Sequence, residues 1–397
     1  MSSVSIPPEP KVLSDNPTDG VTALAFLSPS LLASTSWDGT LRIHNVADQT
    51  LQCAQTVTEA GPLLSMAVHG NYSHQNDRPE ETSTLATVPP IYVGGLDGSI
   101  RRFAAHAAGS RLANGNDDNN SQKNPCLLSR HHKAAVSCLQ WIPHAQGAWL
   151  VSAGWDGFLY LWDPTAIADT EVAKLPPPLA TLSLPGKAFS MDVHTSESRT
   201  LSRIVVACAG RRVCVVQVTT STGTEGSHET HTAPGLLPQV ELVLDRESTL
   251  KYQTRCVRFL QDGVGIALAS IEGRVAIEYF EELDIPAEGK KAYTFKCHRD
   301  GDMVYPVNCL AFHPVHGTFA TGGCDGTVVT WDGSNKKKLV ALPKFPTSIA
   351  ALAFSPDGSQ LAIASSYTFE DGEREHPRDE IYIRAVLDSE VLPKRKQ

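Results

Sequence analysis

The 397-residue sequence has no excess of positive charge, which sets it apart from proteins that bind nucleic acid generally. Its 34 Lys and Arg residues are outnumbered by 43 Asp and Glu residues, giving a formal net charge of −9. A general nucleic-acid-binding protein needs a basic surface that displaces counterions from phosphates. We therefore expect no direct nucleic-acid partner, although a small basic pocket is compatible with this balance.

Cysteine motifs, long apolar runs and nucleotide-binding motifs are also missing. The nine cysteines are odd in number and none are spaced C-x-x-C, which argues against a zinc cluster or a disulfide scaffold and favours a reducing compartment. No apolar run approaches 18 residues, and the start MSSVSIPPEP has neither a basic nor an apolar segment, so we expect no membrane span and no secretory signal. There is no P-loop and no G-x-G-x-x-G motif after a strand, and we expect no cofactor.

What the sequence does contain is an internal repeat: a short alternating strand, a tight turn with Asp-Gly, and a second alternating strand. Asp-Gly between alternating apolar residues is a strong hairpin signal, because the turn needs positive φ at its central residues. The four clearest turns are Trp37–Gly39, Leu96–Gly98, Trp155–Gly157 and Cys324–Gly326. Three weaker copies lie at Gly210–Arg212, at Ile271–Gly273 and between Leu361–Ser366 and Glu380–Val386.

Seven such units, each with four strands and without a long amphipathic helix, predict an all-β fold, a seven-bladed WD-repeat β-propeller that forms one domain over residues 1–397. We expect Lys11–Ser14 to pair with Glu380–Val386, which would join the two ends of the chain in the last blade and shield strand edges. Polar stretches near 72–89, 107–125 and 219–235 lengthen the repeat, and their composition is typical of disordered surface loops.

His132, Ser152 and Asp156 invite comparison with a catalytic Ser-His-Asp triad. Together with Trp162, however, they have the spacing of the buried hydrogen-bond set that joins the strands of a WD blade. In a second blade Thr321, Asp325 and Trp331 repeat the spacing of Ser152, Asp156 and Trp162, with His298 as the candidate that completes the set. Because a set that recurs from blade to blade serves the scaffold, we predict no catalytic residue and a protein that is not an enzyme.

Adjacent pairs such as His131-His132 and Cys297-His298 could suggest metal ligands. Neighbouring residues on a strand point to opposite faces and cannot easily chelate one ion, so we predict no metal site. The basic run Lys394-Arg395-Lys396 is interpreted as a solvated chain end in preference to a localisation signal.

Basic residues at unusual positions of the repeat are the strongest candidates for a binding site. They lie in consecutive repeat units of an acidic protein: Arg211, Arg212, Lys251, Arg255, Arg258, Arg274 and Lys296. Arg side chains bind phosphate and carboxylate groups in a bidentate way, so a local site for an acidic partner is plausible, against the alternative of ordinary surface charge. Trp37 and Trp155 are unusual in turns, where they suit a binding hot spot or pack against the neighbouring blade.

Beyond the repeat itself, the chain contains a series of more specific stretches: Ser36–Gly39, Ala209–Arg212, Leu250–Arg255, Ser270–Glu278, Phe295–Arg299, Tyr305–Asn308, Thr318–Gly323, Pro346–Phe354, Ala362–Tyr367 and Glu380–Arg384. Together these stretches resemble the WD-repeat family of the spindle assembly checkpoint, that of the third Bub protein. The resemblance covers nearly the whole chain and is densest from Leu250 to Arg384. The sister family, a messenger-RNA export factor that docks on a nucleoporin, is the alternative and shares Ile271–Ile277, Phe295–Arg299 and Ala311–Gly317.

The resemblance implies a non-enzymatic adaptor that binds the GLEBS segment of a checkpoint kinase and of its kinase-like or shortened relative. It also implies recruitment to kinetochores through phosphorylated Met-Glu-Leu-Thr repeats of a scaffold protein. Arg274 and Lys296 match the residues that hold the phosphothreonine, and Trp37, Trp155 and Arg255 match residues that contact GLEBS, with Arg211 and Arg212 as further candidates.

The same resemblance extends to cell location and to further partners. It implies a nuclear protein that is found at kinetochores in mitosis, with a cytoplasmic pool and no membrane partner. Ubiquitinated chains, or the assembly that inhibits the anaphase-promoting complex, are additional candidate partners. The chain departs from the family in its long insertions after Tyr72 and Ala107 and in Lys296, which is a point charge where an Arg would offer a bidentate fork.

Overall fold

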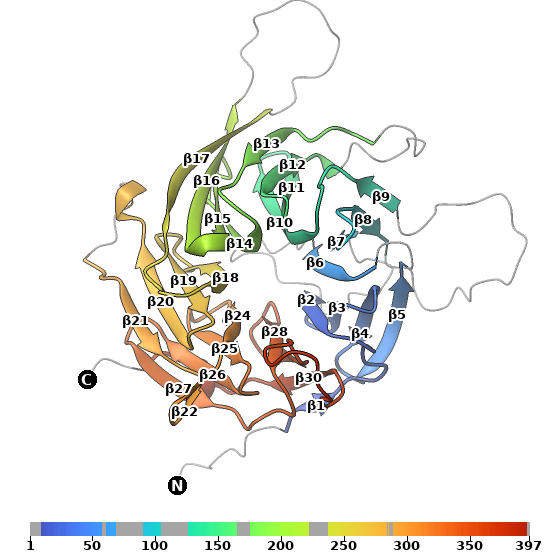
Figure 1. Ribbon diagram of the computed structural model, residues 1–397, viewed down its shortest axis with the longest axis vertical. Helices are drawn as coiled ribbons and strands as arrows, with labels where there is room; N and C mark the ends of the chain where they lie inside the picture. Colours follow the sequence, from blue (N-terminus) through green and yellow to red (C-terminus); the bar gives the residue numbers. More distant parts are fainter. Residues whose placement is uncertain are drawn as a thin grey trace, which may run out of the picture.

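Seven four-stranded antiparallel sheets surround a common axis in the computed structural model (Figure 1), which confirms the predicted all-β, seven-bladed propeller. The structure describes residues 9–57, 61–68, 90–104, 126–164, 175–221, 237–283, 285 and 289–394. The first strand of each blade contacts the first strands of the two neighbouring blades, so these strands surround the axis. In the described part of the chain no helix is both long and apolar enough to cross a membrane.

The strands of the first six blades follow one another directly along the chain. The first blade consists of β2 (Val21–Ser28), β3 (Leu31–Ser36), β4 (Thr40–Asn45) and β5 (Thr50–Thr56), and the second of β6 (Leu63–Val68), β7 (Ile91–Gly95), β8 (Ile100–Phe103) and β9 (Cys126–Ser129). The third blade consists of β10 (Val136–His144), β11 (Gly147–Gly154), β12 (Phe158–Trp162) and β13 (Ala180–Ser183), and the fourth of β14 (Ala188–Thr195), β15 (Leu201–Cys208), β16 (Arg212–Ser221) and β17 (Leu237–Glu247). The fifth blade consists of β18 (Thr254–Phe259), β19 (Gly265–Ser270), β20 (Arg274–Tyr279) and β21 (Tyr293–Lys296), and the sixth of β24 (Val307–Phe312), β25 (Phe319–Gly323), β26 (Val328–Asp332) and β27 (Lys337–Ala341).

The seventh blade is built from both ends of the chain. β28 (Ile349–Phe354), β29 (Gln360–Ser365) and β30 (Glu380–Ala385) are completed by β1 (Lys11–Val12), which pairs antiparallel with β30. The backbone N–H of Leu13 extends this pairing by donating to the carbonyl oxygen of Ile381 at 2.9 Å. The predicted ring closure is therefore confirmed, with the strand ending two residues before Ser14.

The C-terminal segment forms a second connection, between the seventh and the sixth blade. After β30 the chain forms the short helix α1 (Asp388–Val391), in which buried Glu390 makes a bidentate ion pair with buried Arg384 at 2.9 and 3.0 Å. The carbonyl oxygen of Glu390 accepts a hydrogen bond from Thr330 Oγ1 at 2.8 Å, and that of Val391 accepts one from Thr318 Oγ1 at 2.7 Å. Both threonines belong to the sixth blade, so this segment joins two blades that the ring already places side by side.

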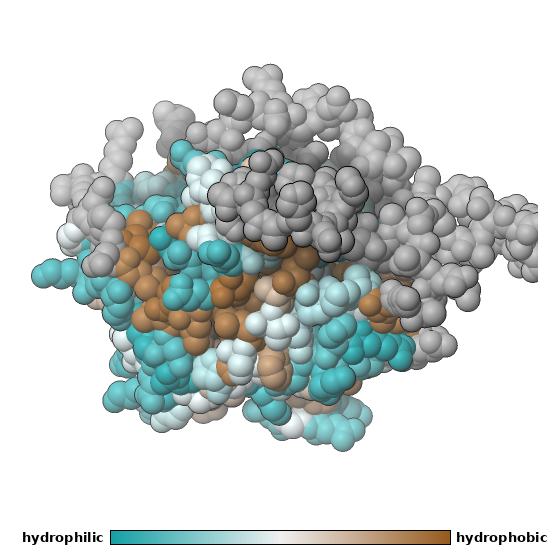
Figure 2. Space-filling view, turned by 90° about the horizontal axis from the view of Figure 1, so that it is seen from above, coloured by the Kyte–Doolittle hydropathy of each residue, from teal (hydrophilic) through white to brown (hydrophobic). Residues whose placement is uncertain are grey.

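The hydrophobic core consists of clusters that neighbouring blades share. In one of them Val151 and Leu161 of the third blade pack with Ile204 and Val216 of the fourth, and all four side chains are fully buried. The fourth strands form the outer wall and alternate between more and less exposed residues, as β17 does. Figure 2 views this wall from the side and shows brown apolar patches between teal hydrophilic residues.

The hydrogen-bond set predicted for the third blade is confirmed. His132 Nδ1 lies 3.0 Å from Asp156 Oδ1, and His132 Nε2 lies 2.8 Å from Ser152 Oγ. Trp162 Nε1 donates to Ser152 Oγ at 2.9 Å. His132 and Ser152 are only 3% and 0% exposed, which leaves no access for a substrate. The triad interpretation is therefore wrong, and these residues join the turn to strands β11 and β12.

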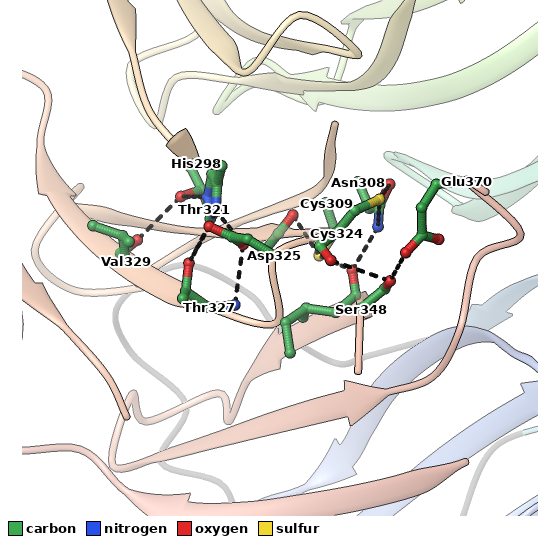
Figure 3. Close-up of polar contacts among 12 residues, drawn as sticks. His298, Asn308, Cys309, Thr321, Cys324, Asp325, Thr327, Val329, Ser348 and Glu370 are labelled. Atoms are coloured by element: carbon green, nitrogen blue, oxygen red, sulfur yellow. Dashed lines mark hydrogen bonds and ion pairs between the residues drawn. The ribbon is translucent and has the colours of Figure 1, made fainter. Parts of the chain in front are cut away.

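The second set occurs in the sixth blade with the same geometry (Figure 3). His298 Nε2 lies 2.7 Å from Thr321 Oγ1, and His298 Nδ1 lies 2.9 Å from Asp325 Oδ1. Trp331 Nε1 completes the set by donating to Thr321 Oγ1 at 2.9 Å. Among the described residues no group of three His, Cys, Asp or Glu side chains is placed to hold a metal ion.

One predicted loop boundary needs correction. Residues 219–221, assigned to the third polar insertion, belong to β16, where Thr219 pairs with Gln239 of β17. Thr220 and Ser221 also pair with this strand, so the ladder continues through residues whose polarity alone suggested a loop. The remainder of that insertion, and the insertions near 72–89 and 107–125, lie outside the described residues.

Candidate functional site

All seven predicted site residues lie at one end of the blades. In an antiparallel blade, the turn between the second and third strands and the connection from the fourth strand to the next blade are at the same end. We call this end the upper face. It carries Trp37, Trp155, Arg211, Arg212, Arg255, Arg274 and Lys296, which lie in these connections or at the strand ends beside them.

Arg274 and Lys296 are direct partners across the β20–β21 ladder. Side chains of opposite residues in an antiparallel pair leave the sheet on the same side, with Cβ atoms about 5 Å apart. Lys296 is exposed, and the Arg274 side chain is 32% exposed with its Nε 3.5 Å from Glu272 Oε2. The structure thus brings together the two cations predicted to hold a phosphate.

A third cation, which the sequence reasoning did not assign, lies beside this pair. Arg299 begins the two-residue strand β22 (Arg299–Asp300), which pairs with β23 (Met303–Val304), and its Nη2 donates to the Glu272 carbonyl oxygen at 2.9 Å. Burial raises the pKa of the Cys297 thiol to about 12, although Arg299 and Arg274 lower it in part. The thiol is therefore neutral at physiological pH and does not offset the positive charge of its neighbours.

Arg211, Arg212 and Arg255 differ in how much of their charge is available. Arg211 forms an ion pair with Glu247 and donates to the Leu250 carbonyl oxygen at 3.1 Å, while Arg212 is 2.6 Å from Asp245. Arg255, by contrast, is exposed on β18, and it forms no ion pair within the part of the chain that the structure describes. The acidic partners were not foreseen, and they make Arg211 and Arg212 weaker candidates than Arg255.

The two turn tryptophans also differ. The Trp37 residue is 43% exposed, as a binding hot spot requires. Trp155 is less exposed, and its buried Nε1 has no hydrogen-bond partner among the described residues. Trp37 therefore fits the predicted role more closely, whereas Trp155 combines both predicted alternatives, partial packing and partial exposure.

Exposed apolar side chains gather on the upper face. Sequence reasoning identified the two turn tryptophans, but further large side chains are exposed in the same turns and connections or at the strand ends beside them. They are Leu96, Phe158, Phe189, Tyr252, Ile271, Met303, Val304 and Phe369. In the sequence they could have been recognised as apolar residues next to a turn. Groups of exposed apolar side chains mark surfaces that bind other proteins.

Comparison with known proteins places the chain among WD-repeat propellers. The family model described as "WD domain, G-beta repeat" matches residues 9–45, 124–163 and 289–332. The crystal structure of the WD40 β-propeller domain of Doa1 superposes with a TM-score of 0.61, covering 94% of this chain and 95% of that one at 16% identity. At that identity the likeness shows the fold alone.

Two curated relatives are similar over almost their full length. The mitotic checkpoint protein BUB3.1 of Arabidopsis thaliana is 37% identical over 390 residues, which cover 97% of this chain and 95% of the relative. The mitotic checkpoint protein bub3 of Dictyostelium discoideum is 34% identical, with coverage of 95% and 94%.

Proposed function

The chain belongs to the Bub3 family of mitotic checkpoint proteins, and from this premise we propose that it is a non-enzymatic adaptor of the spindle assembly checkpoint. Its upper face binds the GLEBS segment of the checkpoint kinase and of its kinase-like or shortened relative. The same face binds phosphorylated Met-Glu-Leu-Thr repeats of a scaffold protein and so brings these partners to kinetochores. The protein is nuclear, is present at kinetochores in mitosis, and has a cytoplasmic pool.

The placement of Arg274 opposite Lys296 is the observation that carries this proposal. A net-acidic protein repels a phosphopeptide at long range, so discrimination has to come from donors that touch the phosphate. Phosphorylation adds nearly two negative charges and three strong acceptor oxygens to a threonine. Two cationic heads on one side of the β20–β21 ladder, with Arg299 close by, offer such donors.

Isothermal titration calorimetry with phosphorylated and unphosphorylated Met-Glu-Leu-Thr peptides tests the proposal. Charge-assisted hydrogen bonds contribute about 1.5–3 kcal/mol each, so Arg274→Ala should remove most of the preference for the phosphorylated peptide. The double change with Lys296→Ala should remove nearly all of it. Lys187→Ala is the matched control, because it removes an exposed cation from the upper face at the entry to the fourth blade.

Binding of a GLEBS segment should survive in the double variant, because that segment contacts other residues. An undiminished phosphate preference in this variant would show that the phosphate is read elsewhere. A pull-down that recovers a nucleoporin but no checkpoint kinase would instead support the messenger-RNA export function.

A further inference from the structure

The connection between β29 and β30, residues 366–379, is longer than the corresponding turn in every other blade. Its first part is held firmly on the upper face. Thr368 Oγ1 lies 3.3 Å from Asn308 Nδ2 and 3.4 Å from Cys324 Sγ of the sixth blade. Glu370 accepts hydrogen bonds from Thr368 Oγ1 at 2.9 Å and from Ser348 Oγ (Figure 3). These contacts fix the loop without any partner present.

Phe369 is the exception within this anchored segment. Its two neighbours, Thr368 and Glu370, point to the protein, and Tyr367 is only 3% exposed, yet Phe369 is 57% exposed. Its φ is +57°, a conformation that bulky side chains seldom adopt. Backbone strain of this kind persists where surrounding contacts enforce it, and it often accompanies function. Here the surrounding contacts turn an aromatic side chain toward solvent.

Trp37 lies next to this loop. A Cβ atom placed on Gly20 would be 3.3 Å from Cδ1 of Trp37 and 3.9 Å from the carbonyl oxygen of Tyr367. Trp37 and Phe369 therefore offer two exposed aromatic side chains on the same part of the upper face, and we call them the aromatic pair. Aromatic side chains are enriched among binding hot spots, and an anchored loop loses little conformational entropy when it binds.

The charge around the aromatic pair determines which partner fits it. The loop has five acidic and two basic residues, and Glu373 and Glu375 are exposed. Within the described residues neither of them forms an ion pair, whereas Arg374 is held by Asp371 at 3.1 Å and by the Tyr367 ring at 4.6 Å. The complementary ligand carries positive charge, in contrast to the cationic part of the upper face around Arg274 and Lys296.

We propose that the aromatic pair is a docking site for an apolar side chain flanked by Lys or Arg, in the partner polypeptide that crosses the upper face. This inference rests on the proposed function, because it assumes a partner segment on that face. It adds that charge determines where the segment lies: its basic, apolar stretch lies on the seventh blade, away from the cationic part of the upper face around Arg274 and Lys296.

Calorimetry with the full chain and a kinase fragment that holds the GLEBS segment and its flanking residues tests this site. Phe369→Ala should weaken binding at least tenfold and leave the melting temperature unchanged. The double change Glu373→Lys with Glu375→Lys should also weaken binding and reduce its dependence on salt. Val315→Ala is the matched control, because Val315 is 64% exposed in the turn between β24 and β25, on the opposite face.

The outcomes distinguish a failure of the proposed function from a failure of the docking site alone. If the unchanged protein does not bind the fragment, the proposed function is overturned. If it binds and Phe369→Ala binds equally well, the docking site alone is overturned. A photo-crosslinking residue in place of Phe369 identifies which part of the fragment contacts this position. The captured peptide should contain an apolar residue beside Lys or Arg, and capture of an acidic peptide would contradict the inference.

Discussion

At the scale of single residues, the two turn tryptophans are expected to respond differently to truncation. Trp37→Ala should weaken GLEBS binding by at least about 2 kcal/mol with little effect on folding, because the residue is 43% exposed. Trp155→Ala should weaken binding and also lower the unfolding free energy, since its ring is partly buried. Calorimetry combined with urea unfolding separates these effects. Unchanged affinity in both folded variants would contradict the assignment.

His313 makes stability depend on pH. Its Nδ1 accepts hydrogen bonds from the backbone N–H groups of Val315 and His316 at 3.2 Å each, and Nε2 lies 3.2 Å from the Gly358 carbonyl oxygen. Burial, followed by the charge of His316, lowers the pKa of His313 from 6.5. The unfolded chain then binds the proton more strongly, so this stabilisation exists above pH 6.5 and is lost as the pH falls toward the folded-state pKa.

Urea unfolding at pH 7 and pH 5 provides the measurement. The unfolding free energy of the unchanged protein should fall more between these values than that of His313→Gln, which cannot titrate. The difference between the two curves isolates His313 from the other buried histidines. Parallel curves for the two proteins would rule out this contribution.

Residue spacing predicted the hydrogen-bond sets of the third and sixth blades but not the ion pairs that take their place in the first two blades. Among the described residues of the first two blades no histidine meets the turn aspartate; instead Arg42 pairs with Asp38 at 2.8 Å, and Arg101 pairs with Asp97 at 3.0 Å. Both arginines lie four residues after the aspartate, so the same i, i+4 spacing recurs, and a search for cations at that offset would have found them.

At the scale of elements, the C-terminal segment should contribute strongly to stability. Glu390→Ala would leave the buried Arg384 guanidinium without its bidentate partner, a change that costs about 3–5 kcal/mol for buried ion pairs. Asp388→Ala, on the exposed side of the same helix, should stay within about 0.5 kcal/mol of the unchanged protein. Urea unfolding of both variants is the measurement, and equal midpoints would contradict the role of the ion pair.

The sequence could predict the strands but not this segment. Each hairpin is local, so alternation and turn residues within about 15 positions identify it. α1 has four residues and no helical period, and its contacts lie far away in the chain: Thr330 is 60 residues before Glu390. In the candidate site, too, some features could be predicted from the sequence and others could not. Arg274 and Lys296 were identified from their unusual positions in the repeat, and the family resemblance assigned them to the phosphate. The ion pairs that neutralise Arg211 and Arg212 depend on β17, whose pairing only the folded blade reveals.

At the scale of the whole molecule, the ring depends on β1. Removing residues 1–13 would leave β30 as an unpaired edge and delete Leu13, which is 2% exposed. Open edges pair with other chains, so this variant should unfold at lower urea concentration and form oligomers in light scattering after size exclusion. Removing residues 1–8, which leaves β1 intact, is the control. A shortened protein that remains monomeric and equally stable would show that the ring closes without this strand.

The pairing that closes the ring also sets when the molecule can finish folding during its synthesis. The backbone N–H of Ile381 donates to Asn16 Oδ1, a contact between residues 365 positions apart. At 5–20 residues per second, a ribosome needs roughly 20 to 70 seconds to span that distance. The N-terminal strand β1 therefore waits without its partner β30 until residues 380–385 have been synthesised. In that interval the propeller is open, and its unpaired strand edges make the nascent chain a substrate for chaperones.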